Sequence, residues 1–200
     1  MDYIAVLTYE HLDNGMFLNA FSKTLARKKK RGIVLHEDSE YTDRLIQTGM
    51  MREDARIRAV KDLNHRLVAL FADQGISTIG LNGYQKKLIT YHDSTISVDE
   101  NQFRQFPSHP VLLISNLVYQ QKTGKPYFAP LPDLVNALNH SLSIEQTFLF
   151  STDEQSSVIK GEFPKQVKPG SIQDSALVKY IPESFLSRNE EYILTSAELF

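Results

Sequence analysis

The residues of this sequence that could do chemistry are carboxylates, histidines and lysines, because the chain contains no cysteine. That absence excludes disulfides, thiolate metal sites and a cysteine nucleophile. The six histidines show no H-E-x-x-H spacing, which argues against a zinc hydrolase. No G-x-S-x-G elbow, P-loop or G-x-G-x-x-G is present either. No single motif therefore assigns a reaction to the chain.

Three carboxylates form the first candidate cluster. Glu10 follows the first apolar run of the chain, and Glu37 and Asp38 follow the second. If these runs are adjacent parallel strands, the three side chains converge, and grouped oxygen ligands suit Mg²⁺ or Ca²⁺. A solvated acidic rim is the simpler interpretation.

A glycine loop is the second candidate site. The stretch 63–89 shows an apolar helical stripe, a buried strand over 76–81, the turn Asn82-Gly83 and a second strand over 87–91. This unit places the loop at the carboxyl end of a strand, where open α/β sheets bind ligands. A plain β-turn is the simpler interpretation of the dipeptide alone.

Apolar runs and helical spacing predict the elements that position these candidates. Strands are expected over 3–8, 33–35, 93–97, 111–115, 117–121, 126–128, 147–150, 176–181 and 191–195, the last two at sheet edges. Helices are expected over 17–31, 40–48, 50–71 and 134–142, polar loops over 9–15 and 100–109, and an irregular segment over 160–175. The alternation of strands with helices predicts an α/β fold with right-handed crossovers and a mainly parallel sheet.

Length and composition favour one domain with one core, since 42% of the 200 residues are hydrophobic. The net charge of −2 does not mark a protein that binds nucleic acid or a membrane surface. The basic run at 27–31 is interpreted as a solvated helix end whose cations complement the helix dipole. No signal peptide and no apolar run of about 20 residues is visible, so a cytoplasmic location is expected.

The order of these motifs over about residues 1–155 resembles the amino-acid kinase family, and the acetylglutamate kinases within it most closely. Gly80-Leu81-Asn82-Gly83 stands where the family usually has Gly-Leu-Ser-Gly. The resemblance implies a three-layer αβα sandwich around a mainly parallel sheet. It also implies phosphoryl transfer from ATP to the side-chain carboxylate of an acylated glutamate, a step of arginine biosynthesis.

The resemblance also implies how the chain is organised. Residues 1–200 would form a single domain whose nucleotide-binding half, at about 150–200, is shortened. Members of the family commonly dimerise through their N-terminal half, so a homodimer is expected, with the helix over 52–71 as a contact surface.

The sequence departs from the family at three places. Thr8–His11 occupies the position of a lysine after the first strand, and Ala129–Pro132 replaces an Asn-Ala-Asp segment. His36 matches a family histidine, but residues 37–39 replace the glycines that follow it. Each change removes a cation, a backbone donor or an orienting side chain that phosphoryl transfer needs.

We therefore expect a non-catalytic homologue that binds an acylated amino acid or a protein partner, with no catalytic residue, metal or cofactor. The residues that the resemblance assigns to ligand binding are His36, Ser39, Gly80, Asn82 and Gly83. The alternative is an active ATP-dependent carboxylate kinase in which a lysine from elsewhere supplies the missing charge. Lys86, Lys87 and Lys125 are the candidates, although surface lysine is the simpler interpretation of all three.

Overall fold

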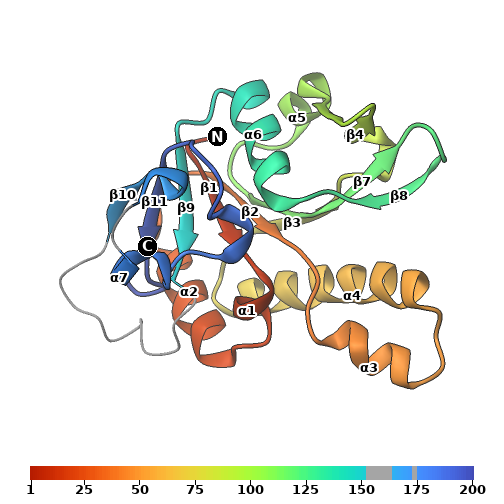
Figure 1. Cartoon of the computed structure of the whole chain (residues 1–200), viewed down its shortest axis with the longest axis horizontal. Coiled ribbons are helices and arrows are strands. Elements are labelled where there is room, and N and C mark those ends of the chain that lie inside the picture. The colour runs from red at the N-terminus through yellow and green to blue at the C-terminus, as the bar shows by residue number, and fades with distance from the viewer. Residues whose placement is uncertain (152–163, 173–174) are drawn as a thin grey trace.

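A seven-stranded sheet runs through the computed structural model, which describes residues 1–151, 164–172 and 175–200 (Figure 1). In sheet order its strands are β10 (Lys165–Val167), β11 (Tyr192–Thr195), β9 (Gln146–Phe150), β1 (Tyr3–Leu7), β2 (Gly32–His36), β6 (Val111–Ser115) and β3 (Thr78–Asn82). All neighbouring pairs are parallel except β10 with β11. The prediction of an α/β fold with a mainly parallel sheet is confirmed.

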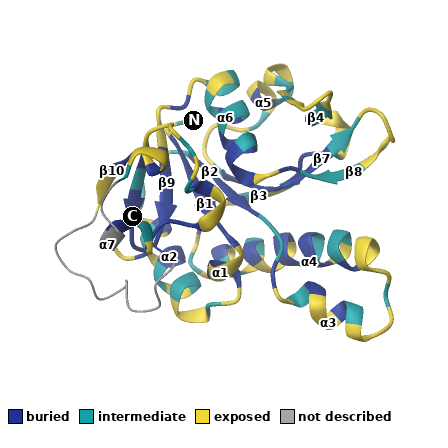
Figure 2. Cartoon of the chain, in the orientation of Figure 1, coloured by how far each residue is buried: buried dark blue, intermediate teal, exposed yellow. Residues whose placement is uncertain are grey.

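The central strands are apolar throughout because both faces of the sheet are covered. Every residue of β1, β2 and β6 is buried, and β1 is dark blue in Figure 2. Successive side chains alternate between two cores, as the pleat requires. In β1, Ile4 and Val6 join one core, while Tyr3, Ala5 and Leu7 join the other.

Helices cover one face, and helices together with a second sheet cover the other (Figure 1). The first layer contains α1 (Tyr9–Leu12), α2 (Gly15–Arg27), α3 (Tyr41–Gln47) and α4 (Arg52–Asp73). The second contains α6 (Leu131–Leu142), with α5 (Glu100–Gln105) nearby, and a four-stranded sheet of β5 (Thr95–Val98), β4 (Ile89–His92), β7 (Leu117–Gln120) and β8 (Lys125–Phe128). Short helices complete the chain: η1 (Gln85–Lys87), η2 (Pro169–Ser171), α7 (Ser175–Val178) and η3 (Glu183–Phe185). The predicted three-layer αβα arrangement is thus present, with a small sheet forming part of one outer layer.

Two predicted loops are helical. The segment 9–15 forms α1 and the start of α2, and Asn14 caps α2 by accepting a hydrogen bond from the Phe17 N–H at 3.0 Å. The segment 100–109 contains α5, because Asp99 accepts the Gln102 N–H at 3.1 Å as an N-cap. In both cases a local cap outweighs the polar composition of the segment.

Two predicted strands differ from the structure near the end of the chain. The segment 176–181 is not a strand, since α7 and a turn occupy it. The strand predicted over 191–195 exists as β11 but is not at an edge, because β10 and β9 flank it. Of the irregular segment predicted over 160–175, residues 160–163 and 173–174 lie outside the described residues, while β10 and η2 form part of the rest.

The basic run is less solvated than predicted. Helix α2 ends at Arg27 instead of residue 31, and Lys28 is its C-cap. The Lys28 Nζ lies 4.0 Å from the ring centroid of Phe200 and 4.7 Å from that of Phe148, so it makes cation–π contacts. Burial lowers the pKa of Lys28. No helix in the described part of the chain combines the length and the apolarity needed to cross a bilayer.

Candidate functional site

A cleft of about 780 Å³ opens beside the carboxyl ends of β1 and β2. Its walls come from the loop after β2, the start of α3, the first turns of α4 and the hairpin β7–β8. The lining residues are Tyr9, Glu37, Asp38, Ser39, Thr42, Asp43, Arg52, Glu53, Arg56, Gln120, Pro126, Tyr127 and Phe128. The cleft therefore lies at the sheet edge where parallel α/β proteins bind ligands.

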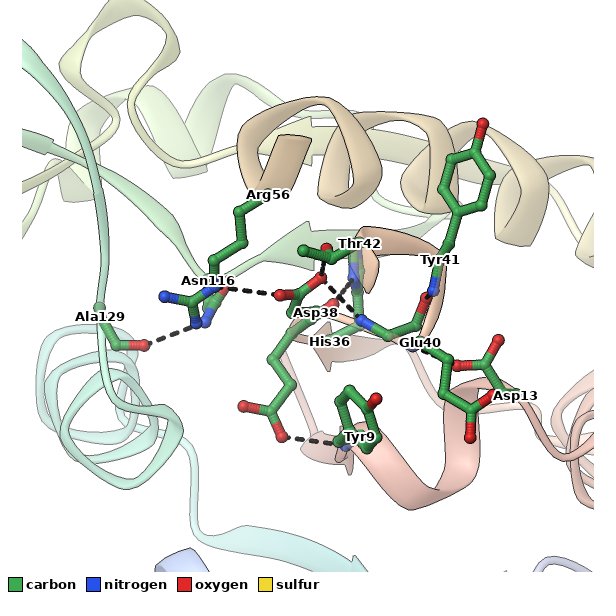
Figure 3. Close-up of polar contacts among 12 residues, drawn as sticks. Tyr9, Asp13, His36, Asp38, Glu40, Tyr41, Thr42, Arg56, Asn116 and Ala129 are labelled. Atoms are coloured by element: carbon green, nitrogen blue, oxygen red, sulfur yellow. Dashed lines mark hydrogen bonds and ion pairs between the residues drawn. The ribbon is translucent and has the colours of Figure 1, made fainter. Parts of the chain in front are cut away.

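Asp38 is the centre of a hydrogen-bond network in this cleft (Figure 3). Its Oδ1 accepts the Ser39 N–H at 2.8 Å and the Thr42 hydroxyl, and its Oδ2 pairs with the Arg56 Nε at 3.0 Å. The Arg56 guanidinium also lies over the Phe128 ring, 3.9 Å from its centroid. Both carboxylate oxygens of Asp38 thus have partners within the chain, and Arg56 is already paired.

Glu37 directly follows β2, and its side chain reaches the backbone that follows β1. Its Oε1 accepts the Tyr9 N–H at 3.0 Å. The pKa of Glu37 is raised to about 7: burial is the main cause and the neighbouring carboxylates of Glu10 and Asp38 add to it, while the Tyr9 hydrogen bond and Arg56 act in the opposite direction. Near neutral pH this carboxyl group exchanges between its charged and neutral forms.

Other backbone donors at the same sheet edge also point to side chains of the protein. The Thr8 N–H donates to His11 Nδ1 at 3.1 Å, which leaves the proton on Nε2, 3.2 Å from the Ser151 carbonyl oxygen. The Glu40 N–H donates to Asp13 Oδ2 at 2.7 Å. After both strands, N–H groups that could hold an anion are engaged internally.

His36 is part of a buried polar network and does not line the cleft. Its Nδ1 lies 3.0 Å from the Glu37 carbonyl oxygen and therefore carries the proton, so Nε2 accepts from Asn64 Nδ2 at 3.0 Å. Burial lowers the pKa of His36 to about 4. The neutral imidazole thus ties β2 to α4.

The glycines predicted to bind ligand lie at close backbone approaches. A Cβ on Gly80 would collide with Asn64 Oδ1 and lie 2.9 Å from Val68 Cγ2, so Gly80 lets α4 pack against β3. A Cβ on Gly83 would lie 2.9 Å from the Leu117 carbonyl oxygen. Neither glycine lines the cleft. Packing alone explains why both positions carry glycine.

The register of the sheet brings the predicted loops to one edge but not to one cavity. His36 and Asn82 both lie beside Ser115, whose hydroxyl donates to Asn82 Oδ1 at 2.8 Å. Of the predicted ligand-binding residues, Ser39 lines the cleft, whereas Asn82 lines a second cavity. Their assignment to ligand binding stays a prediction.

Several side chains of the cleft had no counterpart in the sequence-based prediction. Arg52 and Arg56 are four residues apart on the first turns of α4, and this spacing on an expected helix was the available signal. Phe128, which packs on Arg56, comes from β8 and gave no such signal. Residues 129–132, which replace the Asn-Ala-Asp segment of the family, begin next to Asn116. The Asn116 Nδ2 donates to the Ala129 carbonyl at 3.3 Å, while the buried Asn116 Oδ1 has no partner among the described residues.

The remaining candidates fall outside the cleft. Lys86, Lys87 and Lys125 are absent from its lining. Strands β1 and β2 are adjacent and parallel, which was the condition for Glu10, Glu37 and Asp38 to converge on a metal ion. Within the described ranges, however, no group of three His, Asp or Glu side chains is arranged to hold one.

Comparison with known proteins supports the fold. No protein-family model matches the chain, and no curated protein matches its sequence. A structure of the isopentenyl phosphate kinase substrate complex matches with a TM-score of 0.62 at 10% identity, over 98% of this chain and 91% of that one. Isopentenyl phosphate kinase from T. acidophilum matches with a TM-score of 0.56 at 11% identity, over 74% of this chain and 69% of that one. Aspartate kinase from Synechocystis matches with a TM-score of 0.58 at 11% identity, over 76% of this chain and 28% of that one.

These likenesses define the class of fold. The chain has the amino-acid-kinase fold, an α/β fold that these kinases share. The neighbours do not single out the acetylglutamate kinases, and at such identities the likeness concerns the fold alone.

Proposed function

We propose that this protein is a non-catalytic member of the kinase-fold class that binds a small acylated amino acid in the cleft. One observation carries the proposal: the backbone N–H groups that follow β1 and β2 already donate hydrogen bonds to acceptors within the protein. Side-chain acceptors already hold the N–H groups of Thr8, Tyr9, Ser39 and Glu40. A phosphoryl-transfer site needs such donors free and aimed at the migrating group.

Charge supports the same conclusion. A phosphate at the end of β1 would lie beside Glu37 and Asp38. One such like-charge contact at about 4 Å costs on the order of 4 kcal/mol at an effective dielectric of about 20. The only cation engaged near these groups, within the described structure, is Arg56, and Asp38 already pairs with it. The Arg56 charge is therefore shared already, and among the described residues the unpaired cation of the cleft lining is Arg52, on the first turn of α4.

The rim of the cleft suits a ligand with a single carboxylate and an apolar group. Arg52 lines the cleft and has no partner among the described residues. Pro126, Tyr127 and Phe128 of β8 add apolar residues to the cleft lining. An acylated amino acid offers a carboxylate for Arg52 and an acyl group for these apolar residues. The volume lies within the range of small-molecule sites, roughly 300–1,000 Å³.

Isothermal titration calorimetry tests the proposal with N-acetylglutamate, N-succinylglutamate, ATP and isopentenyl phosphate as ligands. We expect heat from an acylglutamate and none from ATP or isopentenyl phosphate. Arg52→Gln should weaken acylglutamate binding about tenfold, since it removes one charged hydrogen bond. Arg66→Gln is the matched control, because Arg66 is exposed on the same helix and does not line the cleft. No heat from any acylglutamate would refute the proposal.

An active ATP-dependent carboxylate kinase is the second candidate, and it is favoured by the kinase neighbours of the fold. It requires a cation at the migrating phosphoryl group, for which Lys86, Lys87 and Lys125 are poorly placed, since none lines the cleft. Formation of acylglutamyl phosphate from ATP, trapped with hydroxylamine, would establish this function and overturn the first.

A further inference from the structure

A second cavity of about 760 Å³ lies between the end of β3, the turn that follows it and α5. Its lining residues are Leu81, Asn82, Gln85, Lys86, Leu88, Gln102, Gln105 and Phe106. It shares no lining residue with the cleft described above. Its volume is nearly that of the cleft and fits a small molecule.

Carboxamides dominate the polar lining of this cavity. Asn82, Gln85, Gln102 and Gln105 each present a carbonyl acceptor and an NH₂ donor side by side. Much of this capacity is unused within the described structure: Gln105 has no hydrogen bond, and the amide nitrogens of Asn82 and Gln85 have none. Paired donors and acceptors of this kind match a planar group with the complementary pair, as carboxamides do with the edge of a nucleobase.

Lys86 supplies the only charged side chain of the lining. Its backbone and that of Lys87 are left-handed, with φ of 51° and 55°, a conformation that lysine adopts at a cost. Gln102 holds this turn by donating from Nε2 to the Lys86 carbonyl at 3.1 Å, and the same nitrogen donates to Asp99 at 2.8 Å. The fold thus holds the backbone of Lys86 beside the carboxamides, and no ion pair engages its ammonium group within the described structure.

Apolar surface completes the cavity. Leu81, Leu88 and Phe106 are the apolar residues of the lining, and Phe106 is an aromatic residue on which a ring could stack. We propose that this cavity is a second small-molecule site, for an anion that carries a planar donor–acceptor heterocycle. The anionic group would pair with Lys86, and the heterocycle would lie among the carboxamides and Phe106.

Calorimetry with AMP, UMP, orotate and inorganic phosphate tests this site on the full chain. AMP and UMP join a heterocycle to a phosphate, orotate joins one to a carboxylate, and phosphate has no ring. We expect at least one heterocyclic anion to bind and phosphate alone to give no heat. Binding of orotate without AMP or UMP would identify the anion as a carboxylate, and the reverse would identify it as a phosphate.

Two variants locate the binding. Lys86→Asn removes the charge while keeping a residue that tolerates the left-handed backbone, and Gln105→Leu removes one exposed carboxamide. Each should weaken binding about tenfold. Lys122→Asn and Gln47→Leu are matched exposed controls outside this cavity and should bind normally.

The outcomes separate this site from the cleft. Binding that survives Lys86→Asn and Gln105→Leu but is lost in Arg52→Gln would place the ligand in the cleft and overturn the inference. No heat from any heterocyclic anion, or equal heat from phosphate alone, would also overturn it. Because the cavities share no residue, a failure to bind acylglutamates leaves this test unaffected.

Discussion

Replacing Glu37 with glutamine should stabilise the protein, and increasingly so as the pH rises. Burial raises the pKa of Glu37 from its ordinary value of 4.5 to about 7. Glutamine keeps the carbonyl oxygen that can accept the Tyr9 N–H, now 3.0 Å from Glu37 Oε1, and it removes the charge. The substitution therefore isolates the cost of ionising this carboxyl group beside Glu10 and Asp38, against the attraction of Arg56.

The sign follows from proton linkage. The folded protein binds the Glu37 proton more tightly than the unfolded chain does, so ionisation destabilises the fold. Well below pH 4.5 the group is neutral in both states and contributes nothing. Between pH 4.5 and 7 the penalty grows, and above pH 7 it is complete. A shift from 4.5 to about 7 corresponds to a penalty on the order of 3 kcal/mol, at about 1.4 kcal/mol per pH unit.

Urea denaturation of the wild type and of Glu37→Gln at several pH values measures this penalty. We expect the free energies of unfolding to differ by less than about 1 kcal/mol at pH 5 and by about 3 kcal/mol at pH 8, with the variant more stable. Glu53→Gln is the control, because Glu53 is an exposed carboxylate of the same cleft. A difference that is the same at both pH values, or a variant less stable at pH 8, would refute the reasoning.

Three other predictions have defined outcomes. Burial lowers the pKa of His36 from 6.5 to about 4, so protonating His36 should cost the fold up to about 3 kcal/mol as the pH falls from 6.5 to 4, and the free energy of unfolding of His36→Gln relative to the wild type should rise by up to that amount over this range in urea titrations. Gly80→Ala should cost about 1–3 kcal/mol in urea titrations because its methyl group collides with Asn64, and a second change, Asn64→Ala, should recover part of the loss. Replacing Glu37 and Asp38 together by glycine frees donors after both strands, so the double variant should bind pyrophosphate in calorimetry where the wild type does not. Absence of any gain would show that those N–H groups are not aimed at a common anion.

The architecture was predictable because its signals are local. Strands buried on both faces are continuous apolar runs, and 3–8, 33–35 and 111–115 were each found within a residue or two of β1, β2 and β6. The helix over 100–105 was missed although its cap was readable, since Asp99 stands three residues before Gln102 and four before the buried Phe103. That error came from giving polar composition more weight than capping.

The site was predictable only in part because its contacts are long-range. Glu37 and Asp38 stood out against the glycines of the family, and their position at the end of a strand was correct. Nothing in the sequence showed that Asp38 would pair with Arg56 or that Phe128 would cover that pair. These three side chains come from separate elements, and only the packing of α4 and β8 around the sheet edge brings them together.

The internal carboxylates have a consequence for stability as well as for chemistry. Loops at the carboxyl edge of a parallel sheet leave N–H groups that need an acceptor, and an anionic ligand is one way to provide it. Here Glu37, Asp38 and Asp13 provide it permanently, so these loops can be ordered without a ligand. Under the proposed function, the same contacts that satisfy the backbone would exclude a second anion from it. Loss of phosphate binding and ordering of the loops without a ligand would then have one cause, because both follow from carboxylate residues standing where the family has glycines.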